Sequence, residues 1–306
     1  MERLRAGLHP SAGGSMMGTI KIYLPLFKLR ISSLITFSAL VGLISMQTGS
    51  FRVYTAFFLA VATMLAAAAA SIFNHYFDSD IDSLMERTSR RPLAIGGIIS
   101  GSCVLALAAS LFSLSVAISL GALNYMVALH LGLGAFVYAI VYTAWLKRRS
   151  RLNIIVGGLA GSFAVMAGGA SASPELCMPP FLLAVVMFFW TPSHFWSFAI
   201  YNRQEYEKAG LPMLPVVIGD HRTAVYTLIN TVLLVASSIL PYVMGYSGPI
   251  YLATAIVVGL YFIFWNVRMI IDPSREVAWK NFKVSMVYLG LLFASVIVDM
   301  MLKDVF

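Results

Sequence analysis

Long apolar stretches, separated by short polar connectors, run along almost the whole chain. Each is close to the roughly 20 residues that a helix needs to cross a bilayer. They lie near residues 31–50, 53–74, 98–120, 122–145, 154–172, 179–200, 224–245, 249–271 and 283–302. Composition agrees with this pattern, since 59% of the 306 residues are hydrophobic and only 11% are charged. That is too little polar surface for a soluble protein of this size. The sequence therefore predicts an all-α integral membrane protein with nine transmembrane helices.

The first residues differ from the rest of the chain. Residues 1–20 are polar and glycine-rich, and they lack the apolar core of a secretory signal. We interpret them as a flexible cytoplasmic tail. Residues 21–306 are expected to form a single transmembrane domain.

Lysine and arginine residues divide unequally between the two sides of the predicted bundle. With the N-terminus placed inside, 19 of the 21 fall in cytoplasmic segments, and only Arg52 and Lys303 lie outside. Cytoplasmic loops of membrane proteins collect basic residues. The pattern therefore predicts a cytoplasmic N-terminus and an outer C-terminus in the cell membrane. The net charge of +8 is then a topology signal, and no nucleic-acid partner is expected.

The end of the second predicted helix carries an unusual group of acids beside its apolar run. Asn74, Asp78 and Asp82 are spaced four apart, so they share one face of a helix. Like charges at this spacing repel, and a bound cation would reverse the sign. Such oxygen ligands suit Mg²⁺, which also bridges to substrate phosphates. Arg87 and Arg91 are candidates for binding the remaining phosphate charge. The alternative interpretation is an ordinary solvated helix end.

A second polar segment follows the sixth predicted helix. His194, Tyr201 and Glu205 are separated by seven and four residues, so all three can face one side of a helix. Placed opposite the first group, Glu205 would complete a site for a metal-bound diphosphate. Two alternatives stay open. Glu205 could be a solvated loop charge, and His194 could be a hydrogen-bonded packing residue at a kink made by Pro192.

A basic run, which includes Lys147 and Arg148, connects the fourth and fifth predicted helices. By default such a run is an orientation signal. Its second possible role is to neutralise a leaving diphosphate, because Lys supplies a point charge and Arg a bidentate fork. All the polar residues that can do chemistry lie on the same predicted side of the membrane.

The membrane interior holds few ionisable residues. His130 is the main exception, as either a packing or a cavity-facing residue, and Asp299 is read as an interfacial residue near the outer end of the last helix. This scarcity of ionisable residues argues against a transporter or channel.

Gly157 and Gly161 form a GxxxG pair, which indicates a packing face. The five tryptophans are either interfacial anchors or faces for a flat aromatic substrate; they are Trp145, Trp190, Trp196, Trp265 and Trp279.

Taken together, these motifs resemble the UbiA superfamily of intramembrane prenyltransferases over about residues 21–300. Asn74, Asp78 and Asp82 match the first Asp-rich motif of that superfamily. The segments 78–92, 191–196 and 209–217 are similar to its heme O synthase branch, the protoheme IX farnesyltransferases. Two positions depart from the usual pattern. Glu205 stands where the family usually has Asp, and Ser193 stands where a second Pro is common.

The resemblance implies nine transmembrane helices around a central cavity and a Mg²⁺-dependent reaction of farnesyl diphosphate. Asn74, Asp78, Asp82 and Glu205 would hold the metal, and Arg87, Arg91, Lys147, Arg148 and Tyr201 would bind substrate. The acceptor would be a vinyl group of heme b, with water addition to give heme O. His194, or else His75 or His130, would orient the porphyrin or ligate its iron. A heme A synthase or an oxidase assembly factor is a possible partner protein. The alternatives are a UbiA-type enzyme that prenylates a quinone precursor or another lipid and, from a different class, a small-molecule transporter.

Overall fold

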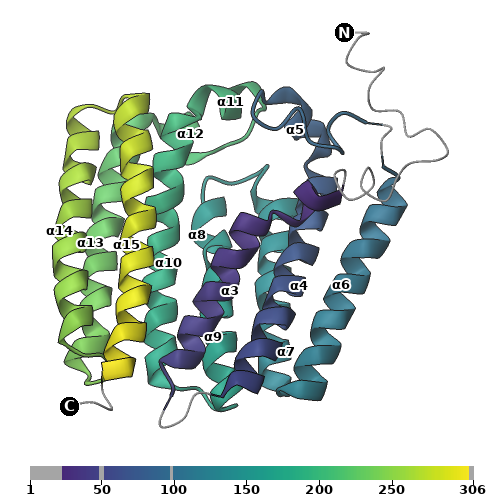
Figure 1. Cartoon of the computed structure of the whole chain (residues 1–306). Coiled ribbons are helices and arrows are strands. Elements are labelled where there is room, and N and C mark those ends of the chain that lie inside the picture. The colour runs from purple at the N-terminus through teal and green to yellow at the C-terminus, as the bar shows by residue number, and fades with distance from the viewer. Residues whose placement is uncertain (1–22, 48–51, 97–98, 303–306) are drawn as a thin grey trace.

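A computed structural model describes residues 23–47, 52–96 and 99–302, and within these residues it is entirely helical (Figure 1). Nine spans in this part of the chain are long and apolar enough to cross a membrane, which confirms the predicted number. They are η1 with α3 (Leu24–Phe27, Leu29–Ile44), α4 (Val53–Phe77), α6 (Gly101–Ala122), α7 with η2 (Tyr125–Phe136, Val137–Leu146), α8 with α9 (Asn153–Gly157, Leu159–Ala172), α10 (Met178–Tyr201), α13 (Asp220–Val243), α14 (Pro249–Ile271) and α15 (Arg275–Leu302). The predicted tail, residues 1–20, and Lys303 lie outside the described residues.

The first span is displaced from its predicted place. It begins at Leu24 and ends at Ile44, whereas the hydrophobic pattern predicted residues 31–50. Pro25 stands at the start of η1, where a missing backbone N–H costs nothing, so the helical segment begins earlier than hydropathy indicated.

The nine spans lie roughly side by side, with large apolar residues on the outside. In Figure 1, α10, α13, α14 and α15 form one half of the bundle, and α3, α4, α6, α7 and α9 form the other. The helix α15 packs against α10, α14 and α3, which joins the two halves. Outward-facing side chains such as Val257, Leu260 and Ile271 are 60% or more exposed. This apolar surface is what a surrounding bilayer requires, because lipid is as apolar as these side chains.

Small residues allow the helices to cross closely. A Cβ atom added to Gly168 of α9 would lie 1.8 Å from the backbone oxygen of Ala39 in α3, and one added to Gly42 would lie 2.1 Å from the oxygen of Val165. The Gly157–Gly161 pair also packs tightly, since added Cβ atoms would meet side-chain carbons of Tyr142 and Met187. The prediction of a packing face there is confirmed.

One end of the bundle carries three short helices: α5 (Ser79–Leu84), α11 (Arg203–Lys208) and α12 (Leu214–Ile218). They lie together at the top of Figure 1. Each predicted polar motif is broken by a helix end. Asp78 is the C-cap of α4 and precedes α5, and Asn202 separates α10 from α11. The predicted continuous helices through Asp82 and through Glu205 are therefore wrong, because the chain turns at Asp78 and at Asn202.

Asp299 has a different role from the one predicted. Its side chain is buried, and its two carboxylate oxygens accept hydrogen bonds from the backbone N–H groups of Ile250 (3.2 Å) and Tyr251 (2.8 Å). These are the first residues of α14, whose N–H groups have no partner within their own helix. Asp299 therefore caps the neighbouring helix, where its charge also complements the helix dipole.

His130 lies on α7, and its Nδ1 atom bonds the backbone oxygen of Met126.

Candidate active site

The first predicted motif forms a buried cluster where α4 ends. The side chains of Asn74 and Asp78 are 4% and 0% exposed, although they stand at the end of a bundle rather than in its middle. The Asn74 amide donates to the Asp78 carboxylate at 2.7 Å and to the Thr143 hydroxyl at 3.1 Å. The ammonium of Lys147 pairs with the same Asp78 oxygen. The structure thus brings Lys147 together with the first acidic motif, as predicted.

The fourth span reaches this cluster through an irregular helix. From Val137 to Leu146 the backbone forms a π-helix, and the Lys147 N–H bonds the oxygen of Tyr142 five residues back. Such wider turns often occur at functional sites. The wider turn rotates the end of the helix, so that Thr143 and Lys147 both face Asn74 and Asp78. The run of aliphatic and aromatic residues gave no sign of this change of period.

The other two acids of the motif are each paired with an arginine. Asp82 is 2% exposed, and it accepts a hydrogen bond of 2.6 Å from Arg91. Arg148 forms a bidentate pair with Asp80, with both bonds at 2.7 Å, and its guanidinium also lies 4.0 Å from Asp78. The hydrogen bonds from Arg148 lower the pKa of Asp80, and those to Asp80 raise the pKa of Arg148. The protein's own cations thus balance the repulsion that the sequence pattern implied.

Lys28 also belongs to this cluster, although the sequence analysis assigned it no functional role. Its ammonium donates to the Asn74 side-chain oxygen at 2.6 Å. Its backbone has φ 43° and ψ 51°, and it is the only described residue other than glycine with positive φ. A left-handed backbone costs most residues on the order of 1–3 kcal/mol and is concentrated at functional sites. The turn between η1 and α3 therefore holds Lys28 against the acidic motif at some cost. Its position as a cation within an apolar run could have indicated a functional role for Lys28 in the sequence.

The second motif meets the first through Tyr206 of α11. Tyr206 is 3% exposed and packs in one cluster with Ile81 and Met85. Burial raises its pKa to about 12, while the nearby charge of Arg87 acts in the opposite direction. Its neighbour Glu205 has one carboxylate oxygen that is buried without a hydrogen-bond partner. Glu205 lies in α11, a separate short helix from the one that carries Tyr201 and His194. The sequence analysis assigned no role to Tyr206.

His194 and Tyr201 lie apart from the acidic cluster, in a row of aromatic rings between α10 and α15. His194 stacks on Trp190 and Phe282, and Tyr201 packs against Trp279 with ring centroids 4.8 Å apart. Trp279 and Phe282 stack in turn, so the predicted shared face of His194 and Tyr201 is confirmed. Tyr201 contacts Trp279, Arg275 and a buried apolar cluster that includes Met269 and Ala278, and among the described residues it has no hydrogen bond to the acids of the first motif. Its substrate-binding role stays a prediction.

Arg87 connects the two regions. Its guanidinium lies 5.3 Å from the centre of the Phe198 ring, and Phe198 contacts Phe282. A cation over an aromatic face is a favourable contact. Arg87 is exposed in the segment that follows α5, and its guanidinium reaches the Phe198 end of the aromatic row.

The acidic motifs contain unpartnered oxygens but no complete metal cage. One oxygen of Asp78 and one of Glu205 are buried without hydrogen-bond partners. Among the described residues, no three His, Cys, Asp or Glu side chains come close enough to hold a metal ion by themselves. Mg²⁺ in phosphate sites is bound by one or two carboxylates, with waters and phosphate oxygens as the other ligands. The donors present fit that kind of site. A cavity of about 220 Å³ lies elsewhere, beside Arg203, Asp220 and Arg275.

Comparison with known proteins accounts for this arrangement. Residues 35–294 match the description of the UbiA prenyltransferase family. The chain belongs to this family. Among curated members, it is 47% identical to protoheme IX farnesyltransferase 1 of Paramagnetospirillum magneticum, over 92% of this chain and 99% of that protein. It is 39% identical to protoheme IX farnesyltransferase of Neorickettsia sennetsu, over 92% of this chain and 93% of that protein.

Solved UbiA-family structures share the fold at low sequence identity. A digeranylgeranylglyceryl phosphate synthase superposes with a TM-score of 0.77 at 20% identity, over 92% of this chain and 98% of that one. A UbiA homolog from Archaeoglobus fulgidus, bound to DMAPP and Mg²⁺, gives a TM-score of 0.68 at 19% identity, over 90% and 99% of the two chains. The predicted UbiA-like fold is confirmed. The predicted orientation in the membrane and the central cavity stay predictions.

Proposed function

We propose that this UbiA-family protein transfers a farnesyl group from farnesyl diphosphate to a vinyl carbon of heme b. Addition of water then gives heme O, and diphosphate leaves. Relatives with 37–47% identity over at least 90% of the chain are protoheme IX farnesyltransferases, which supports this choice of substrates. The observation that carries the proposal is the fully buried carboxylate of Asp78. It pairs with the ammonium of Lys147 and accepts a hydrogen bond from the Asn74 amide.

The charges of the cluster suit a diphosphate. Four cations meet three carboxylates there: Lys28, Arg91, Lys147 and Arg148 lie around Asp78, Asp80 and Asp82. Arginine binds phosphate oxygens in a bidentate manner, and lysine adds a mobile point charge. When a diphosphate enters, Lys147, Arg148 and Arg91 can turn toward its oxygens and leave the carboxylates free. The same side chains then stabilise the charge that develops on the leaving group.

Mg²⁺ is the cofactor in this proposal, and it would neutralise the diphosphate as that group departs. The metal would be held on one side by Asn74, Asp78 and Asp82. One oxygen of Asp78 is buried and has no hydrogen-bond partner. Glu205 of α11 would contribute a further oxygen ligand, since one of its carboxylate oxygens is buried without a hydrogen-bond partner. The phenol of Tyr206, with a pKa of about 12, stays protonated at neutral pH and can donate a hydrogen bond beside them.

The apolar surroundings have a second task, which is to keep water away from the allylic cation. Ile81, Met85, Tyr142 and Trp196 belong to one buried apolar cluster, and Ile81 precedes Asp82 in α5. The prenyl chain would occupy the apolar space between the helices. The active site would face the cytoplasm of the cell, because the basic residues gather at that end of the spans. The product would pass to a heme A synthase or to an oxidase assembly partner.

The proposal is tested with purified protein, heme b and a set of prenyl diphosphates. We expect farnesylated, hydrated heme by mass spectrometry and Mg²⁺-dependent release of diphosphate. Asp78→Asn and Asp82→Asn should lower that release by at least about 100-fold, the scale of removing a group that stabilises developing charge. Asp272→Asn is the matched control, because Asp272 is exposed and bonds only to nearby Ser274. Full turnover by Asp78→Asn would remove the metal assignment. A quinone precursor accepted in place of heme would move the protein to the sister branch.

A further inference from the structure

His194 is held rigidly among aromatic rings. The indole of Trp190 stacks on the imidazole with centroids 4.2 Å apart, and the Phe282 ring stacks on it at 4.4 Å. The interplanar angles are 18° and 29°, so each ring covers a face. Two nearly parallel rings this close cannot share one face, so the imidazole lies between them. Only the edge of the imidazole, with its two nitrogens, is left for a ligand.

Ser285 determines which nitrogen of His194 carries the proton. The Ser285 hydroxyl oxygen lies 2.6 Å from the backbone oxygen of Phe282, and we infer that its single hydrogen is donated there. The same hydroxyl oxygen lies 2.7 Å from Nδ1 of His194. With its hydrogen already used, the hydroxyl must accept from Nδ1–H. The neutral imidazole is therefore protonated at Nδ1 and carries a lone pair on Nε2.

The lone pair of Nε2 is available. This nitrogen has no hydrogen bond to a described residue, the side chain is half-buried, and Nε2 is not among the enclosed polar atoms of the described chain. Trp190 adds to the rigidity, since its indole N–H donates to the Ser285 backbone oxygen at 2.7 Å. Ser285 of α15 is thus hydrogen-bonded to both Trp190 and His194 of α10.

The other described histidines near the bundle interior are less suited to bind a ligand. Both ring nitrogens of His75 are fully enclosed by protein and have no partner, and the side chain is 2% exposed. His130 lies on α7, and its described ring contact is with Phe163, away from the acidic cluster. His130 also carries its proton on Nδ1, because the Met126 carbonyl can only accept. His194 differs from it by its place in the aromatic row, where Phe282 leads on to Phe198 and Arg87.

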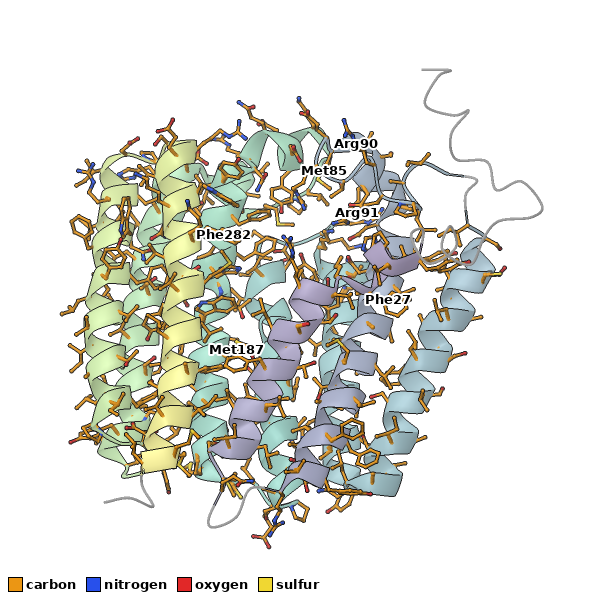
Figure 2. All side chains as sticks on the ribbon, viewed as in Figure 1. Phe27, Met85, Arg90, Arg91, Met187 and Phe282 are labelled. Carbon is orange, nitrogen blue, oxygen red and sulfur yellow. The ribbon has the colours of Figure 1, made fainter. Side chains whose placement is uncertain are left out.

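A short series of contacts leads from His194 to Arg87, a residue of the segment that follows the acidic motif. Phe282 touches both His194 and Phe198, and Phe198 lies under Arg87. Figure 2 shows Phe282 projecting from α15 toward the middle of the molecule, at about the level of Arg91 on the other side. A molecule lying against this row would therefore reach Arg87, one of the two arginines predicted to bind the diphosphate.

We propose that Nε2 of His194 is an axial ligand to the iron of the acceptor porphyrin, and that Ser285 positions it by fixing the tautomer. This inference rests on the proposed function, because it assumes an iron porphyrin as the acceptor. Imidazole is a common ligand of heme iron. Metal-bound histidines typically donate their other N–H to a nearby acceptor, which orients the ring. The porphyrin would meet the edge of the imidazole, and its periphery would extend toward Arg87 and the allylic carbon.

The test compares iron-containing and metal-free porphyrin. Full-length protein in detergent is titrated with ferric heme b, followed by the Soret band, and with protoporphyrin IX, followed by fluorescence. The wild type should shift the Soret band and bind heme more tightly than metal-free porphyrin. His194→Ala should lose both the shift and the preference, and Ser285→Ala should weaken heme binding about tenfold. Both variants should bind metal-free porphyrin as the wild type does, which also shows that they are folded.

His221→Ala is the matched control, since His221 is exposed at the start of α13 and is the described histidine most open to adventitious heme binding. It should leave the Soret shift unchanged. An unchanged shift in His194→Ala, or a wild type without preference for heme, overturns the ligand assignment. Product formation is measured by mass in the same samples. Farnesylated heme without a His194-dependent shift refutes only this inference, whereas absence of product from all acceptors refutes the proposed function.

Discussion

Removing the ammonium of Lys147 tests whether the acid–base cluster stabilises the fold as well as the substrate. Asp78 is fully buried, and one of its oxygens is shared by Lys147 and Asn74. The variant Lys147→Met keeps the length of the side chain and most of its packing. It leaves the buried carboxylate with the Asn74 amide and, at 4.0 Å, the guanidinium of Arg148.

The expected magnitude follows from the burial of this pair. Removing one partner of a buried ion pair costs about 3–5 kcal/mol, because the other charge is left uncompensated. The guanidinium of Arg148 recovers part of that loss, so we expect about 3 kcal/mol for Lys147→Met. In the double variant Lys147→Met/Asp78→Asn the stranded charge is gone. Replacing a whole buried pair is often close to neutral, and we expect a free energy of unfolding within about 1 kcal/mol of the wild type.

Two assays separate the structural role from the catalytic one. The free energy of unfolding is measured by denaturant titration in mixed micelles, and diphosphate release is measured with Mg²⁺ and farnesyl diphosphate. Both the single and the double variant should release little diphosphate, but only the single variant should be unstable. Wild-type stability for Lys147→Met, or equal instability of the two variants, would refute the reasoning that Asp78 is a buried charge held by Lys147.

Three further predictions concern packing, capping and pH. Gly168→Ala should destabilise the protein by several kcal/mol, because the new Cβ atom would meet the backbone of α3 at 1.8 Å, whereas Gly290→Ala, with nothing within 4 Å, should stabilise it by up to about 1 kcal/mol; denaturant titration of both variants checks this. Asp299→Ala should cost about 1–2 kcal/mol by removing the cap of α14, and hydrogen exchange should rise in the first turn of that helix if the reasoning holds. The Arg148 contact lowers the pKa of Asp80 from 3.8, so its contribution is present above about pH 4 and is lost as pH falls through the lower folded-state value. Because the Asp80 side chain is 63% exposed, Asp80→Asn should change stability by less than about 1 kcal/mol at pH 7, and a larger measured change would contradict this.

The two polar motifs show how far a spacing argument reaches. The i, i+4, i+8 pattern correctly placed Asn74 and Asp78 on one face, but the chain turns at Asp78 and carries Asp82 into a separate helix. The same happened at Asn202 before Glu205. Periodicity describes a helix that continues, and it contains no information about a turn that neighbouring loops stabilise.

Residues distant in the sequence were the ones missed. Lys28 and Thr143 complete the environment of Asn74 from 46 and 69 residues away. A lysine and a threonine near the ends of apolar spans are ordinary residues in a sequence, and the π-helix that turns Thr143 inward has no compositional signal. Asp299 was assigned to the interface for the same reason, because the helix that it caps is only its neighbour in space.

The sequence by itself determined the class of the protein, the number of its spans and the acidic motif with the cations that flank it. Hydrophobic length and charge bias are local quantities, and the bilayer imposes them on every segment in turn. Tertiary structure alone decided which cation neutralises each carboxylate, that Tyr206 of α11 joins one buried cluster with Ile81 of α5, and that Ser285 lies against Nδ1 of His194. Those relations depend on how helices cross, and crossings are set by close packing between residues far apart in the chain.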